Sequence, residues 1–241
     1  MDNLLSLVVE AHGGLDRWSA VHAILVHATV SGGFWERKGQ AGILGDVTFQ
    51  IDPRYQRVTI SPLAGAGTAS DYDRATDSIV IRTTDGKVVQ QRSDVRRSFN
   101  GFNRVSKWDT IQAGYFISYG MWNYMTEPFM LTYPGVEAHE IEPWEEEGQR
   151  WRRLHVLFPR TTTTHNAEQV FYFDESGMQH RMDYAPEVNG NVLVAQYQYE
   201  PKAFDGIVVP TRRVVRLRSE DGIADMSTGS ILIEIHDVEY S

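Results

Sequence analysis

Apolar and polar residues alternate over much of the chain, and short turns rich in glycine and polar residues interrupt the alternation. In residues 24–30, Ile24, Val26, Ala28 and Val30 occupy every second position, and a Gly-Gly turn follows. A period of two indicates a strand with one buried face. The same reasoning predicts strands over residues 45–51, 54–61, 78–83, 87–92, 136–141, 150–158, 168–173, 178–184, 192–199, 207–217 and 230–240.

The connections between these strands are short and polar. Asp85-Gly86, Asn189-Gly190 and Asp221-Gly222 are residue pairs of the kind that hairpin turns require. Short turns join antiparallel neighbours, because parallel neighbours need long crossovers. We therefore predict a mainly β (α+β) fold, built on one large antiparallel sheet. A sheet of so many twisted strands tends to curl.

Helical patterns precede the first strand. Asp2 or Asn3 can cap a short helix with an apolar stripe, and the glycines after His12 stop it. A second short helix is predicted over residues 15–21, with Trp18 turned inward.

The remaining helical pattern, over residues 106–127, is unusually rich in aromatic residues. Ser106 or Asp109 lies near its start, and Glu127-Pro128 ends it. Its apolar residues recur at spacings of three and four, which places them on one helix surface. We expect this helix to lie in the hollow of the sheet, where the aromatic surface either completes the core or lines a pocket for a hydrophobic molecule. The candidate wall residues are Trp108, Ile111, Tyr115, Phe116, Tyr119 and Trp122.

Composition narrows the function classes. The 241 residues are 41% hydrophobic, which suffices for one domain over residues 1–241. A net charge of −9 argues against a nucleic-acid partner, which requires a basic surface. Local basic groups at 150–153 and at Arg212-Arg213 fit a solvated sheet face. The chain has no cysteine, which excludes disulfides and thiolate chemistry, and we expect no metal and no cofactor.

No apolar run is long enough to predict a membrane-spanning helix. The N-terminus lacks the basic residues and the cleavage site of a secretory signal, so we expect the cytoplasm. A periplasmic or secreted location would follow if a leader had been removed.

Four segments together resemble a known family. They are AHGGLDRW at residues 11–18 and the stretches 133–159, 171–184 and 199–213. The acidic turn at 174–177 and the Asp205-Gly206 turn before Val209-Pro210-Thr211 are the more specific features. In this order they resemble the LolA/LolB-type lipoprotein-carrier fold, and more narrowly bacterial LolA-like proteins of largely unassigned function. The resemblance implies an unclosed antiparallel half-barrel, helices plugging its concave face, and a hydrophobic cavity that accommodates acyl chains or other lipids. It brings no catalytic motif.

Acid–base chemistry in the same cavity is the alternative. His165 follows a threonine-rich loop at the predicted rim of the sheet. Strict alternation in residues 178–184 places His180 on one face with Tyr184, and places Asp183 on the other face. Burial beside aromatic rings could raise the pKa of Asp183 into a working range. The acidic run at 145–147 is expected to be a solvated turn.

Three hypotheses follow. The first is a carrier or sensor that binds a hydrophobic small molecule or lipid. The second is a cofactor-free isomerase, cyclase or hydrolase that uses His165, His180, Asp183 or Tyr184 on a hydrophobic substrate. The third is an interaction protein without a small ligand. The pattern leaves the oligomeric state open.

Overall fold

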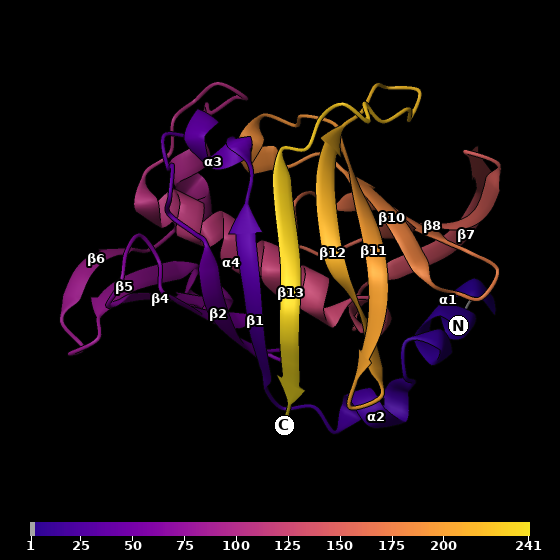
Figure 1. Ribbon diagram of the computed structural model, residues 1–241, viewed down its shortest axis with the longest axis horizontal. Helices are drawn as coiled ribbons and strands as arrows, with labels where there is room; N and C mark the ends of the chain where they lie inside the picture. Colours follow the sequence, from indigo (N-terminus) through magenta and orange to yellow (C-terminus); the bar gives the residue numbers. More distant parts are fainter. Residues whose placement is uncertain (1–2) are drawn as a thin grey trace.

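The computed structural model describes residues 3–241, and in them thirteen strands form a single antiparallel sheet (Figure 1). The strands are β1 (Ile24–Ser31), β2 (Asp46–Asp52), β3 (Arg57–Ser61), β4 (Thr68–Asp73), β5 (Ser78–Thr83), β6 (Val88–Arg92), β7 (Glu137–Glu146), β8 (Gln149–Leu157), β9 (Glu168–Phe173), β10 (Gln179–Tyr184), β11 (Val194–Phe204), β12 (Ile207–Leu217) and β13 (Ile231–Tyr240). Their spatial order is β6-β5-β4-β3-β2-β1-β13-β12-β11-β10-β9-β8-β7.

The first and last strands meet in the middle of this sheet. β1 pairs with β13, so the two halves of the chain join there, while β6 and β7 remain as free edges. Figure 1 shows the sheet curving around the helix α4 (Thr110–Thr126), which crosses its concave side. The prediction of an unclosed, curved antiparallel half-barrel is confirmed.

The sequence of α4 explains both its start and its burial. Asp109 caps the helix by accepting a hydrogen bond from the N–H of Gln112, and Gln112 accepts one from the N–H of Asp109 in return. Every residue from 111 to 126 is buried. A helix buried on every side needs cover all round. The concave face of the sheet covers one side of α4, and the segments 95–99 and 129–132 also pack against the helix. The predicted end at Glu127 is confirmed, while Ser106 lies outside the helix.

The remaining helices are short. The predicted N-terminal pair is present as α1 (Asn3–Ala11) and α2 (Leu15–Ser19); Asp2, the alternative cap, lies outside the described residues. A third helix, α3 (Gly33–Arg37), stands where we expected only a turn. Short 3-10 segments are η1 (Arg74–Thr76), η2 (Val95–Phe99), η3 (Phe129–Thr132) and η4 (Glu187–Asn189).

One strand escaped prediction. β4 has the polar sequence TASDYD, which carries few of the β-branched and aromatic residues that mark strands. Its inward positions, Ser70 and Tyr72, are nevertheless fully buried against the core.

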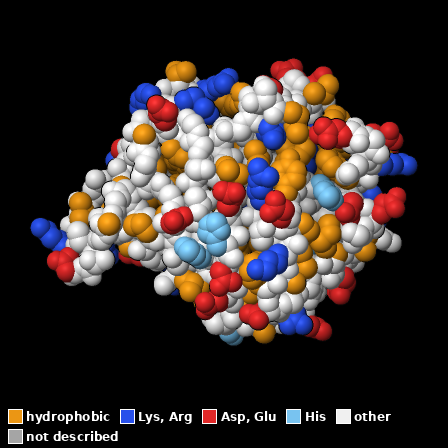
Figure 2. Space-filling model, in the orientation of Figure 1, with side chains coloured by type: hydrophobic (Ala, Val, Ile, Leu, Met, Phe, Trp, Pro, Cys, Tyr) orange, Lys and Arg blue, Asp and Glu red, His pale blue; other side chains and the backbone are white. Residues whose placement is uncertain are grey.

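The outer face of the sheet carries mixed side chains. Figure 2 shows basic, acidic and apolar groups interspersed over this face, without one large area of a single charge. No helix within residues 3–241 is both long and apolar enough to cross a membrane.

Candidate ligand-binding site

A partly enclosed apolar pocket lies at one end of the half-barrel, between α3, α4 and the ends of strands β10–β13. Its cavity volume is about 40 Å³. The apolar and aromatic part of its wall consists of Phe34, Phe116, Tyr184, Pro186, Val192, Val194, Val215, Leu217 and Ile231. The polar part consists of Arg37, Lys38, Arg104, Asn189 and Ser230.

Backbone contacts place α3 over the pocket. Gly32 has φ 115°, and a Cβ at this position would lie 2.4 Å from the carbonyl oxygen of Ser230. Only glycine permits this approach. The N–H of Phe34 then donates to the same carbonyl at 2.9 Å, which fixes the first turn of α3 against the start of β13.

Lys38 is a buried cation in this wall. Its side chain is 1% exposed, and Nζ donates to the carbonyl oxygens of Asn103, Arg104 and Ser106 at 3.0–3.3 Å. Nζ also lies 4.7 Å from the centre of the Trp108 ring. No carboxylate in the described part of the chain lies within ion-pair distance of it. Burial lowers the pKa of Lys38 to about 8, and the nearby positive charges act in the same direction.

The six candidate wall residues of the aromatic helix are all buried, but of these six Phe116 alone lines the pocket. The others, Trp108, Ile111, Tyr115, Tyr119 and Trp122, form part of the hydrophobic core around α4.

Ring contacts show how closely the aromatic members of this set are packed. The Trp108 ring contacts the rings of Phe34 and Phe99 edge to face, with ring centres 5.3 Å apart in each pair. Trp122 donates from Nε1 to the carbonyl oxygen of Asp52 at 2.9 Å. The aromatic helix therefore mainly supports the pocket, and α3 and the strand ends supply most of its wall.

His165 and Tyr184, two of the four catalytic candidates, lie in one buried cluster. Their rings stack with centres 4.1 Å apart. The two ring nitrogens of His165 contact the hydroxyls of Tyr119 at 3.2 Å and Tyr124 at 2.7 Å, and Tyr124 contacts the hydroxyl of Tyr184 at 3.2 Å. This hydrogen-bonded chain runs to the pocket, which Tyr184 lines. Burial lowers the pKa of His165 to about 3, so the imidazole is neutral near pH 7.

The other two candidates, His180 and Asp183, lie on the outer face of the sheet. A β-bulge between Gln179 and Arg181 adds one residue, and alternation shifts at that point. His180 consequently stacks on Trp151, with ring centres 5.4 Å apart, and does not share a face with Tyr184. The structure therefore brings together two of the four candidates and separates them from the other two.

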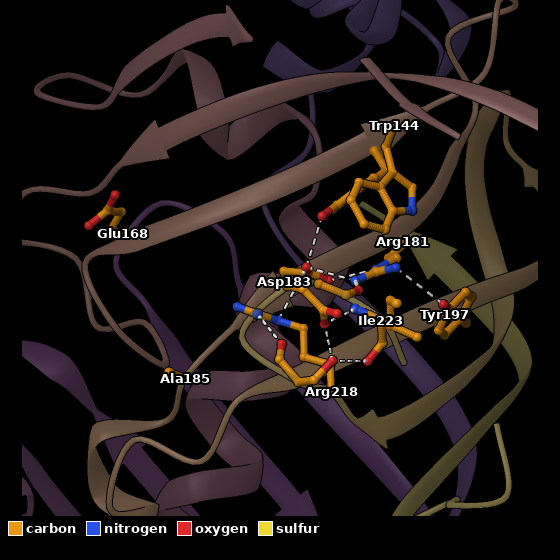
Figure 3. Close-up of polar contacts among 12 residues, drawn as sticks. Trp144, Glu168, Arg181, Asp183, Ala185, Tyr197, Arg218 and Ile223 are labelled. Carbon is orange, nitrogen blue, oxygen red and sulfur yellow. Dashed lines mark hydrogen bonds and ion pairs between the residues drawn. The ribbon is translucent and has the colours of Figure 1, made fainter. Parts of the chain in front are cut away.

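A second buried polar network occupies this outer face (Figure 3). Arg181 is 0% exposed and bonds both carboxylate oxygens of Asp183 at 2.7 and 2.8 Å. Its Nη1 also donates to Glu146 at 2.7 Å, and Arg218 lies 3.2 Å from Asp183 on the other side. The prediction of a solvated turn at 145–147 is wrong for Glu146, because β7 extends to this residue and carries it to Arg181.

An inner polar cluster lies at the end of α4. Arg213 is 1% exposed and pairs with Glu127 at 3.0 Å, so the predicted solvated position of this arginine is wrong. Burial raises the pKa of the Glu127 carboxyl, against the opposite effect of Arg213. Within residues 3–241, no group of three His, Asp or Glu side chains forms a metal-binding arrangement.

Comparison with known proteins gives structural matches alone. No family model matches the chain, and no curated protein matches it. A domain provisionally named as an outer membrane lipoprotein-sorting protein, from Vibrio parahaemolyticus, aligns with TM-score 0.54 at 10% identity, over 98% of this chain and 91% of that one. A LolA superfamily protein from Nitrosomonas europaea aligns with TM-score 0.51 at 7% identity, over 97% and 92%. The fold is LolA-like. A DUF1329 family protein from Desulfovibrio piger shares the LolA-like fold, with TM-score 0.51 at 13% identity, over 98% and 91%.

Sequence reasoning missed the residues of the pocket except Phe116 and Tyr184. Lys38 gave no signal, since a lysine after a predicted turn is normally exposed. The valines of β11 and β12 lie in strands that were predicted, but nothing in their spacing distinguishes pocket wall from core.

Proposed function

We propose that the protein binds a hydrophobic small molecule or the acyl chain of a lipid in the pocket beneath α3, and acts as a carrier or sensor. The observation that carries this proposal is a pocket with an almost continuous apolar inner wall, next to the core of a LolA-like half-barrel. Each methylene buried there would contribute about 0.8 kcal/mol. The structural matches named above support the fold on which the proposal depends.

A ligand larger than a few water molecules requires the pocket to widen, since the cavity volume is about 40 Å³. The side chains suited to move are those at its mouth. Arg37 and Arg104 are exposed, and Arg104 belongs to an exposed loop of residues 103–105. Val194 and Val215 belong to the paired strands and would stay in place as the inner wall.

The enzymatic alternative has less physical support. A general base needs a free lone pair, and both nitrogens of His165 already contact tyrosine hydroxyls. Burial also raises the pKa of Tyr124 and of Tyr184, so neither phenol ionises readily. We therefore propose that this cluster holds α4 against the sheet and forms one side of the pocket.

Native mass spectrometry of the purified protein, followed by solvent extraction, tests the proposal without assuming a ligand. N-phenyl-naphthylamine, an uncharged fluorescent probe of apolar sites, gives a second measurement. Leu217→Trp places a larger ring in the pocket wall and should abolish probe binding. Leu157→Trp makes the same exchange on β8, at a side chain 43% exposed and outside the pocket, and should leave binding unchanged.

Retained lipophilic molecules, or probe binding that Leu217→Trp removes, would support the proposal. Absence of both retained ligand and probe binding would contradict it. Equal loss of binding in the two tryptophan variants would place the probe elsewhere and would also contradict it.

A further inference from the structure

We propose that the pocket selects an amphiphile with an anionic head group, such as a carboxylate or a phosphate monoester on a single alkyl chain. This inference rests on the proposed function and adds the chemical class of the ligand. The apolar inner wall would take the chain, and the basic mouth would take the anion.

The charge of the pocket differs from that of the whole protein. The chain has a net charge of −9, yet the pocket wall contains three basic residues and no acidic residue. Those three are Arg37, Lys38 and Arg104. In Figure 2, several Lys and Arg side chains lie at the edge of the molecule where Figure 1 places α3, with an acidic side chain beside them. A local positive field in an acidic protein attracts anions and disfavours cationic ligands.

The two arginines are available for a ligand. Arg37 and Arg104 are exposed, and among the described residues neither has a carboxylate within ion-pair distance. A guanidinium binds carboxylate or phosphate through paired N–H groups, which gives both strength and orientation. The two side chains lie at the mouth, where the head group of a ligand with a buried chain would be.

Lys38 adds a buried charge that an anion would balance. Three backbone carbonyls solvate its ammonium group, but carbonyl dipoles do not neutralise a full charge. The charged groups near it are Arg37 and Lys107, both of the same sign. A bound anion would place a negative charge beside these groups of like sign.

Asn189 is a further polar group in the same wall. It is 7% exposed, and within residues 3–241 its amide oxygen has no hydrogen-bond partner. The unpaired atom is an acceptor, so the partner that it lacks is a hydrogen-bond donor and not an anionic oxygen. Asn189 therefore adds no contact to the anion, and the inference rests on the three basic residues of the wall.

Four ligands with the same alkyl chain test the inference: dodecanoate, dodecyl phosphate, dodecanol and dodecyltrimethylammonium. Displacement of N-phenyl-naphthylamine at pH 7, below the micelle concentration of each ligand, gives their affinities. We expect the two anions to bind about tenfold or more tightly than dodecanol, since hydrogen bonds to charged groups are the stronger ones. The cationic ligand should bind most weakly.

Variants that lack the two arginine charges test whether Arg37 and Arg104 cause the preference for anionic ligands. The double variant Arg37→Gln/Arg104→Gln should weaken dodecanoate binding about fivefold to tenfold and leave dodecanol unchanged, because two solvent-accessible charge contacts are lost. The matched control is Arg97→Gln/Arg150→Gln, which removes two exposed arginines outside this pocket. It should leave both affinities unchanged.

The outcomes separate the two proposals. If dodecanol binds as tightly as the anions, the head-group inference is wrong while the apolar site stands. If the control double variant weakens dodecanoate equally, the effect is general electrostatics and the inference is again wrong. If the uncharged probe and all four ligands fail to bind, the proposed function itself fails. A preference for one anion over the other identifies the head group within the proposed class.

Discussion

Replacing Val215 with isoleucine distinguishes a binding pocket from ordinary core packing. Val215 lies on β12, is 4% exposed, and faces the cavity of about 40 Å³. Empty cavity volume costs about 24 cal/mol per Å³, so filling this cavity completely would stabilise the fold by about 1 kcal/mol. One added methyl group should recover part of that amount while it narrows the space for a ligand.

Two assays on the same variant measure these effects. Urea denaturation should show an unfolding free energy raised by up to about 1 kcal/mol. Titration with N-phenyl-naphthylamine should show weaker binding. Stability gained at the expense of function is the usual result when a binding site is filled. Val214→Ile is the control, because Val214 is the next residue on the same strand and faces the opposite side of the sheet.

A loss of more than about 1 kcal/mol in Val215→Ile would mean that the site is already fully packed, since overpacking costs about 1–3 kcal/mol. Unchanged probe binding in a stable variant would mean that the probe binds elsewhere. Either result would refute the reasoning. An identical loss of binding in Val214→Ile would do the same.

Three further predictions concern buried charged or titratable groups. Arg181→Met should destabilise the protein by about 3–5 kcal/mol in urea denaturation, because it removes the buried guanidinium that bonds both Asp183 and Glu146. Arg57→Met, at an exposed ion pair, should cost less than about 1 kcal/mol. Equal costs in the two variants would contradict the prediction. His165 should show a neutral imidazole by nitrogen NMR at pH 5. The free energy of unfolding should fall as pH drops from about 6.5 towards 3, because this histidine takes up a proton in the unfolded state and not in the folded state. A protonated ring at pH 5 would contradict this prediction. Dodecanoate affinity should fall as pH rises above about 8, because Lys38 loses its proton in the free protein while a bound anion favours the charged form. An affinity that is independent of pH between 7 and 10 would show that Lys38 does not contribute to binding.

The strand pattern predicted most of the sheet, since alternation reports directly which face of a strand is buried. The strand prediction failed where a β-bulge or an unusual strand composition interrupts the alternation of apolar and polar residues. The bulge at His180 reverses the face of that residue, and no residue type in the segment marks the bulge. β4 was missed because only two of its side chains enter the core.

The site was predicted less completely, for a physical reason. A pocket is a property of elements far apart in sequence, here α3, the loop before α4 and the ends of β11–β13. Phe116 was found through the aromatic pattern of its helix, and Tyr184 was found as an acid–base candidate on its strand. Glu146 and Arg213 were expected in solvent, because charged residues usually lie there, and nothing was predicted for Lys38. Tertiary partners that the sequence does not reveal bury Lys38 and Arg213 and partly bury Glu146.

The most direct test of the central claim is a crystal structure of the protein with dodecanoate brominated at its terminal carbon. Anomalous scattering locates the bromine without reference to the fold. We predict a bromine peak against Val194 and Val215, with the carboxylate at Arg37 and Arg104. A bromine found on the outer face, or a pocket without bromine in crystals of protein that binds the ligand in solution, would contradict the claim.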